Sequence, residues 1–163
     1  MVQPSTVSIR PAGPEDFDQI ADLTVRVYVE GGLANEGYTP QLADVSGRAS
    51  RAELLVARDG DGRVVGCVAL VLSGDFGEVT ESDEEAAFRM LVVDPSVRGQ
   101  GLGKLLVTTC LERARLAGKR RMVLSTGTRM VAAQRLYERL GFTRLPERDW
   151  SPVPDIDLRV YSR

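Results

Sequence analysis

The residues with the clearest chemical signature form a glycine-rich segment, RGQGLGKLL, at positions 98–106. Three glycines alternate there with other residues, and an apolar run follows. Glycine lets the backbone adopt positive φ and approach a ligand closely. Where such a segment opens a helix, unbonded N–H groups and the helix dipole favour an anion. The segment therefore predicts a phosphate site.

Two familiar phosphate loops do not fit this spacing. A P-loop requires glycine where Arg98 stands and a magnesium-binding hydroxyl where Leu105 stands. The dinucleotide fingerprint, started at Gly99, requires its third glycine where Lys104 stands. Because no magnesium ligand is evident nearby, we interpret the phosphates as groups that anchor a ligand and do not themselves react.

Basic residues surround the segment. From Arg98 to Arg121 there are seven Lys and Arg residues and one acid, Glu112. Arg98 and Lys104 flank the glycines and are the better candidates for phosphate contacts, whereas others can simply solvate an outer helix face. Nucleic-acid binding through this stretch is the weaker interpretation, because the whole chain has a net charge of −2.

Composition narrows the chemistry further. The 163 residues are 43% hydrophobic and 27% charged, which predicts one globular domain, 1–163. There is no histidine, so Ser-His-Asp and Cys-His catalysis are excluded. Cys67 and Cys110 are not spaced as a metal site, and we expect no metal. With no apolar signal segment or membrane-length run, we expect a cytoplasmic protein without a membrane partner.

Periodicity and turn signals give the order of the elements. We expect helices from about residue 14, over 102–116 and over 129–140, with a short helix near 40–48. Strands are expected over 7–10, 53–58, 63–72, 86–93, 121–125, 142–145 and 156–161. Strands outnumber helices, so a doubly wound dinucleotide fold does not fit.

Three segments resemble the GNAT N-acetyltransferases. VDPSVRGQGLGKLL (93–106) resembles the family's acyl-coenzyme A signature, in which Gln or Arg, two residues, Gly, one residue and Gly or Ala follow in order. AQRLYERLGF (133–142) resembles its later helix and the strand after it, and IRPAGPEDFDQI (9–20) its usual beginning. The resemblance implies an α+β fold of three layers, with a mixed, mostly antiparallel central sheet of about seven strands flanked by helices.

The resemblance also implies a set of cofactor residues. Coenzyme A would be held by the strand end and the glycine loop, at Leu91, Val92, Val93, Arg98, Gly99, Gln100, Gly101, Leu102, Gly103 and Lys104. The family has a break in strand pairing there, and the backbone amide of Leu91 would polarise the thioester carbonyl. Met130 stands where many members carry an Asn that contacts the cofactor.

The proton-transfer residues have competing interpretations. The resemblance implies that Tyr137 is the general acid, although Leu136, Tyr137 and Leu140 also form an apolar stripe that would pack in a core. The general base is Glu84 or Glu85, or else a water chain. The two glutamates end an acidic stretch, 75–85, that either attracts a cationic amine or only solubilises a loop.

The family implies the activity as well. The chain would transfer an acetyl group from acetyl-CoA to a primary amine of a small molecule or peptide, with Tyr28, Glu30 and Tyr38 contacting the acceptor. Glu36 has a similar position, and Asp149 and Trp150 are weaker candidates. The alternative is a non-catalytic sensor that binds acyl-CoA. Dimers are common in the family, so a homodimer is an expected assembly.

Overall fold

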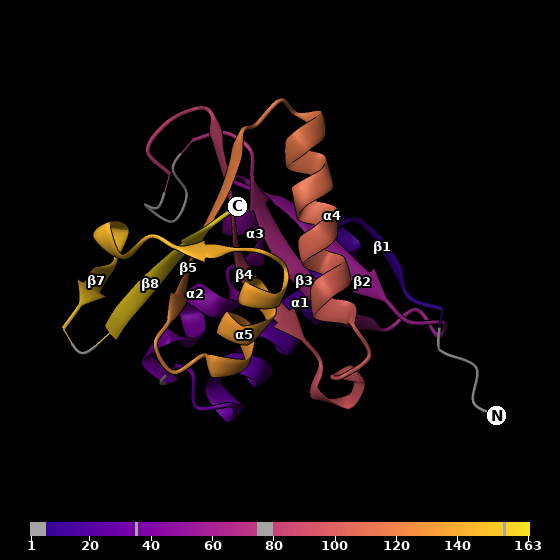
Figure 1. Ribbon diagram of the computed structural model, residues 1–163. Coiled ribbons are helices and arrows are strands. Elements are labelled where there is room, and N and C mark those ends of the chain that lie inside the picture. Colours follow the sequence, from indigo (N-terminus) through magenta and orange to yellow (C-terminus); the bar gives the residue numbers. More distant parts are fainter. Residues whose placement is uncertain (1–5, 35, 75–79, 155) are drawn as a thin grey trace. The chain divides into compact units, whose positions relative to one another are not determined.

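The computed structural model describes residues 6–34, 36–74, 80–154 and 156–163. Its elements are labelled in Figure 1. The strands are β1 (Ser8–Pro11), β2 (Glu53–Arg58), β3 (Val64–Val71), β4 (Glu85–Val93), β5 (Arg121–Gly127), β6 (Thr143–Arg144), β7 (Trp150–Val153) and β8 (Ile156–Ser162). The α-helices are α1 (Phe17–Val25), α2 (Thr39–Ala43), α3 (Val45–Ala49), α4 (Leu102–Leu116) and α5 (Val131–Arg139). Short 3₁₀ turns are η1 (Pro14–Asp16), η3 (Glu36–Tyr38), η4 (Pro95–Val97) and η5 (Pro146–Arg148), and η2 (Arg26–Glu30) is a π-helix.

The strand order is β1-β2-β3-β4-β5-β8-β6, with β7 also paired to β8. The β4–β5 pairing is parallel, and the pairings of β1 with β2 and of β8 with β5, β6 and β7 are antiparallel. The predicted class, a mixed and mostly antiparallel sheet with flanking helices, is confirmed. The described residues form eight strands where about seven were expected, and the additional one is β7.

The chain divides into two compact units. One contains the residues up to Ala69 and Met90–Leu106, and the other contains Leu70–Arg89 and Val107–Arg163. Strands β3 and β4 each contribute residues to both units. The single domain expected for 1–163 therefore stays a prediction.

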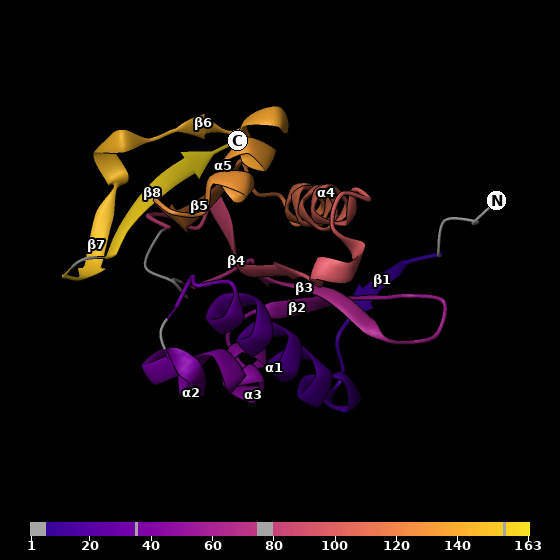
Figure 2. The same cartoon turned by 90° about the horizontal axis from the view of Figure 1, so that it is seen from below.

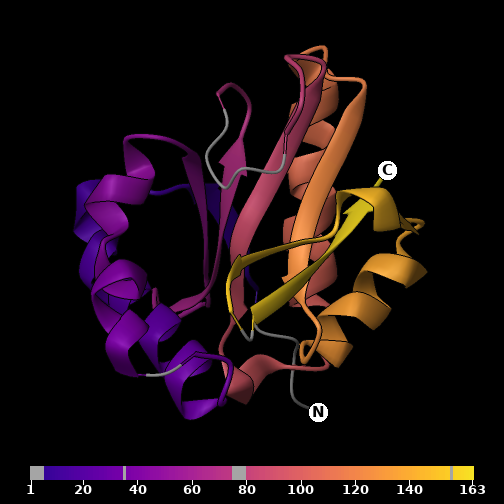
Figure 3. The same ribbon diagram turned by 90° about the vertical axis from the view of Figure 1, so that its left-hand side faces the viewer.

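In the first unit, helices α1, α2 and α3 lie together on one face of β2 and β3 (Figures 2 and 3). The apolar positions of α1 recur at helical spacing, so Ile20 and Leu23 enter one core with Leu54 and Val56 of β2. The buried carboxylate of Asp16 fixes the start of this helix. It accepts hydrogen bonds from Arg10 of β1 at 2.8 and 3.0 Å and also binds Arg58 of β2.

In the second unit, β5 pairs with β8 over Val123–Gly127, and β6 and β7 follow one another along the other edge of β8. A buried aromatic cluster joins Phe88 of β4, Tyr137 of α5, Phe142, and Tyr161 of β8. No described helix is both long and apolar enough to span a bilayer.

Candidate functional site

The first component of the site is a distortion in β4. Met90 has φ 55°, and among the described residues no other non-glycine residue has positive φ. A left-handed residue inside a strand interrupts the regular direction of its backbone groups, as in a β-bulge. The residue that follows is Leu91, whose amide the family resemblance assigns to the thioester carbonyl. The parallel pairing of β4 with β5 covers Glu85–Ala87 and thus ends three residues before Met90.

Beyond the distortion, alternate side chains of β4 have different surroundings. Val92 is 1% exposed and belongs to the core of the first unit. Leu91 and Val93 are half-buried and point the other way. Val92 thus anchors the strand in the core, and the contact of Leu91, Val92 and Val93 with coenzyme A stays a prediction.

The glycine loop is the second component. Gly99 and Gly101 both have φ +81°, and a Cβ built on either would have nothing within 4 Å. Helix α4 begins at Leu102, and the N–H of Leu105 donates to Gly101 O at 3.0 Å. The N–H groups of Leu102 and Gly103 precede that bond and have no acceptor within the helix. The loop therefore presents open space beside backbone donors, which fits a pyrophosphate.

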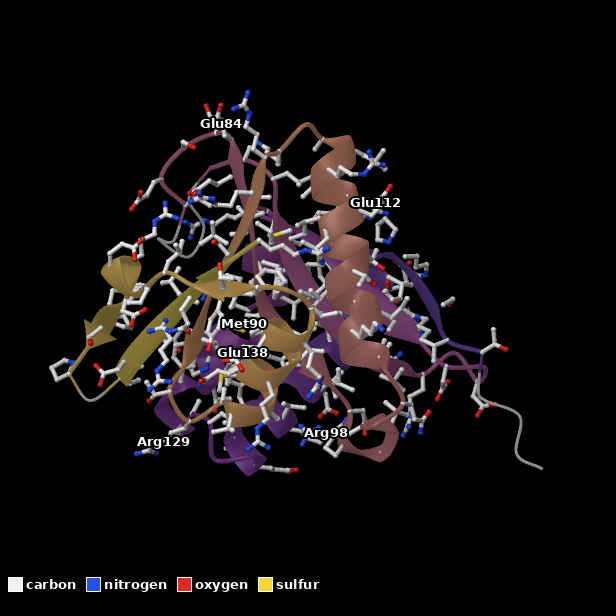
Figure 4. The ribbon with its side chains drawn as sticks, in the orientation of Figure 1. Glu84, Met90, Arg98, Glu112, Arg129 and Glu138 are labelled. Carbon is white, nitrogen blue, oxygen red and sulfur yellow. The ribbon has the colours of Figure 1, made fainter. Side chains whose placement is uncertain are left out.

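Positive side chains border this loop. Arg98 is exposed immediately before the two left-handed glycines, and Figure 4 shows it where the chain turns toward α4. Gln100 and Lys104 are also exposed, Lys104 on the first turn of α4. Charge predicted Arg98 and Lys104 as phosphate contacts and the resemblance added Gln100; in the structure they lie on the loop and the adjoining first turn of α4, all in the first unit. Their contact with coenzyme A stays a prediction.

Gly66 of β3 lets the first turn of α4 approach the sheet. A Cβ at Gly66 would lie 3.0 Å from Leu106 Cδ1, 3.2 Å from Leu102 Cδ2 and 3.3 Å from Val92 O. Leu102 and Leu106 are both buried, so α4 is held by its own apolar stripe. This close approach fixes the N-terminus of α4, with its free N–H groups, relative to the end of β4.

Tyr137 lies in the second unit and is 4% exposed. Its ring centroid is 5.7 Å from Phe88, 5.9 Å from Phe142 and 6.3 Å from Tyr161. The packing predicted from the apolar stripe of α5 is therefore present. Packing of the ring is compatible with a role for its hydroxyl, so the general-acid assignment stays a prediction.

Glu85 is engaged in an ion-pair network at the start of β4. Its carboxylate accepts hydrogen bonds from Arg148 at 2.9 and 3.0 Å and from the Glu81 N–H at 2.9 Å, and Arg121 lies 3.6 Å away. Burial raises the pKa of Glu85, but the hydrogen bonds and nearby arginines lower it by more, so that it ends below the usual value. A carboxylate with a lowered pKa is a weak proton acceptor.

Glu84 differs from its neighbour. Its side chain is 65% exposed and lies 3.7 Å from Arg120. Both glutamates belong to the second unit, whereas Leu91 belongs to the first. The assignment of the general base to Glu84, to Glu85 or to a water chain stays a prediction. Asp75 and Glu78 of the acidic stretch lie outside the described residues.

The proposed acceptor residues lie in the first unit, after α1. Tyr28 and Glu30 belong to the π-helix η2, and Tyr38 ends η3. Tyr28 packs against the core, and its carbonyl accepts the N–H groups of Leu33 and Ala34 at 2.8 and 3.0 Å. Glu30 and Tyr38 are exposed. π-Helical turns occur frequently at functional sites.

Two other residues bear on the chemistry. Met130, which stands where relatives carry Asn, is the N-cap residue of α5, and its sulfur lies 3.6 Å from Thr126 Oγ1. Cys67 is buried, and its burial raises the pKa of the thiol to about 12. Cys67 is therefore unsuited to proton transfer at neutral pH. Among the described residues, no group of three or more Cys, Asp or Glu side chains is arranged to hold a metal.

The comparisons with known proteins agree with this architecture. The model of the acetyltransferase (GNAT) family matches residues 17–142, so the chain belongs to that family. An uncharacterised N-acetyltransferase of Schizosaccharomyces pombe is 31% identical over 168 residues, covering 100% of this chain and 97% of the relative.

More specific relatives match in part. The N-acetylaspartate synthetase of Rattus norvegicus is 35% identical over 103 residues, or 63% of this chain, and the match spans 32% of that protein's length. Among solved structures, a GNAT acetyltransferase of Staphylococcus aureus superposes with a TM-score of 0.77 at 17% identity, covering 97% of this chain and 98% of the other. A Salmonella typhimurium acetyltransferase solved with acetyl-CoA superposes with a TM-score of 0.67 at 23% identity, covering 98% and 94%. These structures support the fold.

Proposed function

We propose that the protein transfers an acetyl group from acetyl-CoA to a primary amine by direct attack of the amine on the thioester. The observation that supports this most is the sequence of features in one unit: a left-handed residue in β4, then Leu91, then two left-handed glycines at the start of α4. The first feature can redirect an amide toward a carbonyl, and the last can hold phosphates.

Acetyl-CoA supplies the activated acyl group when it is bound. In the proposed reaction, the Leu91 N–H donates to the thioester carbonyl oxygen. The neutral amine would form the C–N bond as the C–S bond breaks, and its surplus proton would leave through water. The Tyr137 hydroxyl would give a proton to the departing sulfur and would then be reprotonated from water. The amine must first deprotonate, because a lysine-like amine has a pKa of about 10.4.

The acceptor is proposed only as a primary amine of a small molecule or peptide. The relatives do not narrow it, since one is named for N-acetylaspartate synthesis and another, from Trypanosoma brucei brucei, for acetylating glucosamine 6-phosphate. A cytoplasmic location and a homodimer likewise stay proposals.

An acceptor screen tests the activity. Thiol release from acetyl-CoA is measured with aspartate, glucosamine 6-phosphate, polyamines, amine antibiotics and lysine peptides, and each product is checked by mass spectrometry. We expect turnover with at least one amine and none with its hydroxyl analogue. Tight binding of coenzyme A without turnover on any amine would contradict the enzyme and support the sensor.

The second candidate, an acyl-CoA sensor, is favoured by the surroundings of the proton-transfer residues. Tyr137 is packed in an aromatic cluster, and the Glu85 carboxylate is held by Arg148. Both positions are accounted for without catalysis. Replacement of the tyrosine hydroxyl separates the two candidates.

For the enzyme, we expect Tyr137→Phe to lower kcat by about 100-fold, since the proton donor is lost. The coenzyme A Kd should change by less than about twofold, because the ring still packs. Tyr161→Phe is the matched control: Tyr161 belongs to the same cluster, and its hydroxyl donates to Glu138 at 3.2 Å. Equal kcat values for the two variants would remove the general-acid assignment.

A further inference from the structure

A buried carboxylate lies where β4 turns into the glycine loop, outside the set of residues predicted from the sequence. Asp94 is 4% exposed. Its Oδ1 accepts hydrogen bonds from the Ser96 N–H at 2.9 Å and the Ser96 hydroxyl at 2.8 Å. Its own N–H donates to Val65 O at 2.8 Å. Asp94 therefore fixes the turn η4, after which Arg98 and Gly99 follow directly.

The other oxygen of this carboxylate contacts an arginine that is distant in sequence. Arg26 Nη2 lies 3.4 Å from Asp94 Oδ2, and Arg26 Nε lies 3.3 Å from the exposed carboxylate of Asp22. Burial raises the pKa of Asp94, but hydrogen bonds from Ser96 and Arg26 lower it by more. The carboxylate is therefore charged at neutral pH and needs a cation beside it.

Arg26 is the first residue of the π-helix η2, which also carries the proposed acceptor residues Tyr28 and Glu30. Its guanidinium thus joins that helix to the end of β4. The Arg63 side chain also reaches this turn, donating to Ser96 Oγ at 3.1 Å, but from an exposed position on β3's preceding turn. Among the ion pairs of the described residues, Arg26 is the only partner of the Asp94 carboxylate.

The glycine loop depends on its two ends for its direction. Around Gly99 and Gly101 no atom lies within 4 Å of a built Cβ, so packing at these two positions does not constrain the backbone. One end is held by the buried first turn of α4 against Gly66, and the other by the Asp94 turn. A shift of about 1 Å at such a support is enough to weaken a preorganised site.

We infer that Arg26 is a positioning residue for coenzyme A, which acts through Asp94 to set the direction in which the glycine loop leaves β4. Arg26 itself makes no contact with the phosphates in this proposal. The inference rests on the coenzyme A site of the proposed function. It adds that part of the cofactor affinity is determined in the helix assigned to the acceptor.

The test is a double-mutant cycle on coenzyme A binding, measured by calorimetry on the full chain. Arg26→Gln removes the cation, whereas Asp94→Asn removes the charge but keeps an oxygen for Ser96. We expect each to raise the Kd about fivefold, and the double variant to be no weaker than either one. Asp22→Asn, which removes the exposed partner of the same arginine, should leave the Kd unchanged.

Several outcomes would overturn the inference. Additive losses in the double variant would mean that Arg26 contacts the ligand independently of Asp94. An unchanged Kd in folded Arg26→Gln would mean that the pair has no role in binding. Thermal unfolding of each variant identifies those that fail to fold, and Asp94→Asn then serves as the milder variant.

Kinetics provide a second measurement. A positioning role predicts that Arg26→Gln raises the KM for acetyl-CoA about fivefold with kcat within about twofold, and that Arg26→Lys recovers part of the loss. A uniform fall in kcat with unchanged KM would instead indicate loss of folded protein. If the wild type binds no coenzyme A, the proposed function fails; if it binds and the Arg26 variants match it, only this inference fails.

Discussion

At the scale of single residues, two glycines at opposite ends of α4 have nearly the same backbone conformation. Gly101 precedes the helix with φ +81°, and Gly118 follows it with φ +79°. A Cβ on either would enter open space. Replacement of either glycine by alanine should therefore lower the unfolding free energy by a similar amount, about 1–2 kcal/mol, because alanine is strained in the left-handed region.

Of these two variants, we expect only Gly101→Ala to affect cofactor binding, because its Cβ would occupy the space beside the N–H groups at the start of α4. Its coenzyme A Kd should rise about tenfold, which corresponds to about 1.4 kcal/mol. Gly118→Ala should match it in urea-unfolding stability and keep the wild-type Kd. Equal affinities for the two variants would place the phosphates away from this loop.

The sequence predicted local conformation best where a residue's type determines it, as at Gly99 and Gly101. Few other residues tolerate a left-handed backbone beside a helix start, so the spacing of these glycines was informative. The role of Arg98 at a phosphate site stays a prediction. The Arg26–Asp94 pair was not predicted, because 68 positions separate the partners. Only the Asp-Pro-Ser run at 94–96 signals the capped turn, and it does not identify the arginine.

At the scale of elements, the distortion of β4 has no sequence signal. Met90 adopts φ 55° although methionine has no preference for that region, so tertiary structure must impose it. The resemblance implied a break in strand pairing near this residue, but composition and periodicity alone predicted a continuous strand. Strand β7 was not predicted either, and it contains Pro152, a residue that is unusual inside strands. Among the described residues β7 pairs with β8 alone, and an edge strand of this kind tolerates proline.

Met90 offers a test with two substitutes of equal size. A β-branched side chain is strained in the left-handed region more than an unbranched one. We expect the unfolding free energy of Met90→Leu to lie within about 0.5 kcal/mol of the wild-type value. That of Met90→Ile should be lower than that of Met90→Leu by about 1 kcal/mol. If the distortion directs the Leu91 amide, Met90→Ile should also lower kcat/KM about tenfold.

The measurements for this pair are urea unfolding and initial rates with the acceptor found in the screen. Leucine and isoleucine variants with equal stability would mean that the left-handed conformation is not maintained in solution. A stability difference without a difference in kcat/KM would separate the distortion from catalysis.

At the scale of the whole molecule, the pattern of charges determines how stability responds to pH. The chain has no histidine, so no imidazole titrates between pH 5 and 8. Buried or paired carboxylates have lowered pKa values in both units, as at Asp16, Glu85, Asp94 and Asp149. The fold was predicted more fully than these pairs were, because periodicity reports which face is buried and not which charges meet.

Asp16 gives the sharpest pH prediction. Burial raises the pKa of Asp16, but hydrogen bonds from Arg10, Arg58 and the Gly13 N–H lower it by more, so that the pKa ends at about 2. The folded pKa lies below the unfolded value of about 3.9. The charged form therefore stabilises the fold above about pH 4, and this stabilisation is lost as the pH falls toward 2.

We expect Asp16→Asn to lose about 2 kcal/mol of unfolding free energy at pH 7, and the gap from wild type to narrow steadily between about pH 4 and 2. Asp18→Asn, an exposed change two positions along, should follow the wild-type curve at each pH. The measurement is urea unfolding of the three proteins at a series of pH values. A gap that persists unchanged at pH 2 would show that Asp16 acts through its shape and hydrogen bonds, because a contribution from its charge must disappear once the carboxylate is protonated.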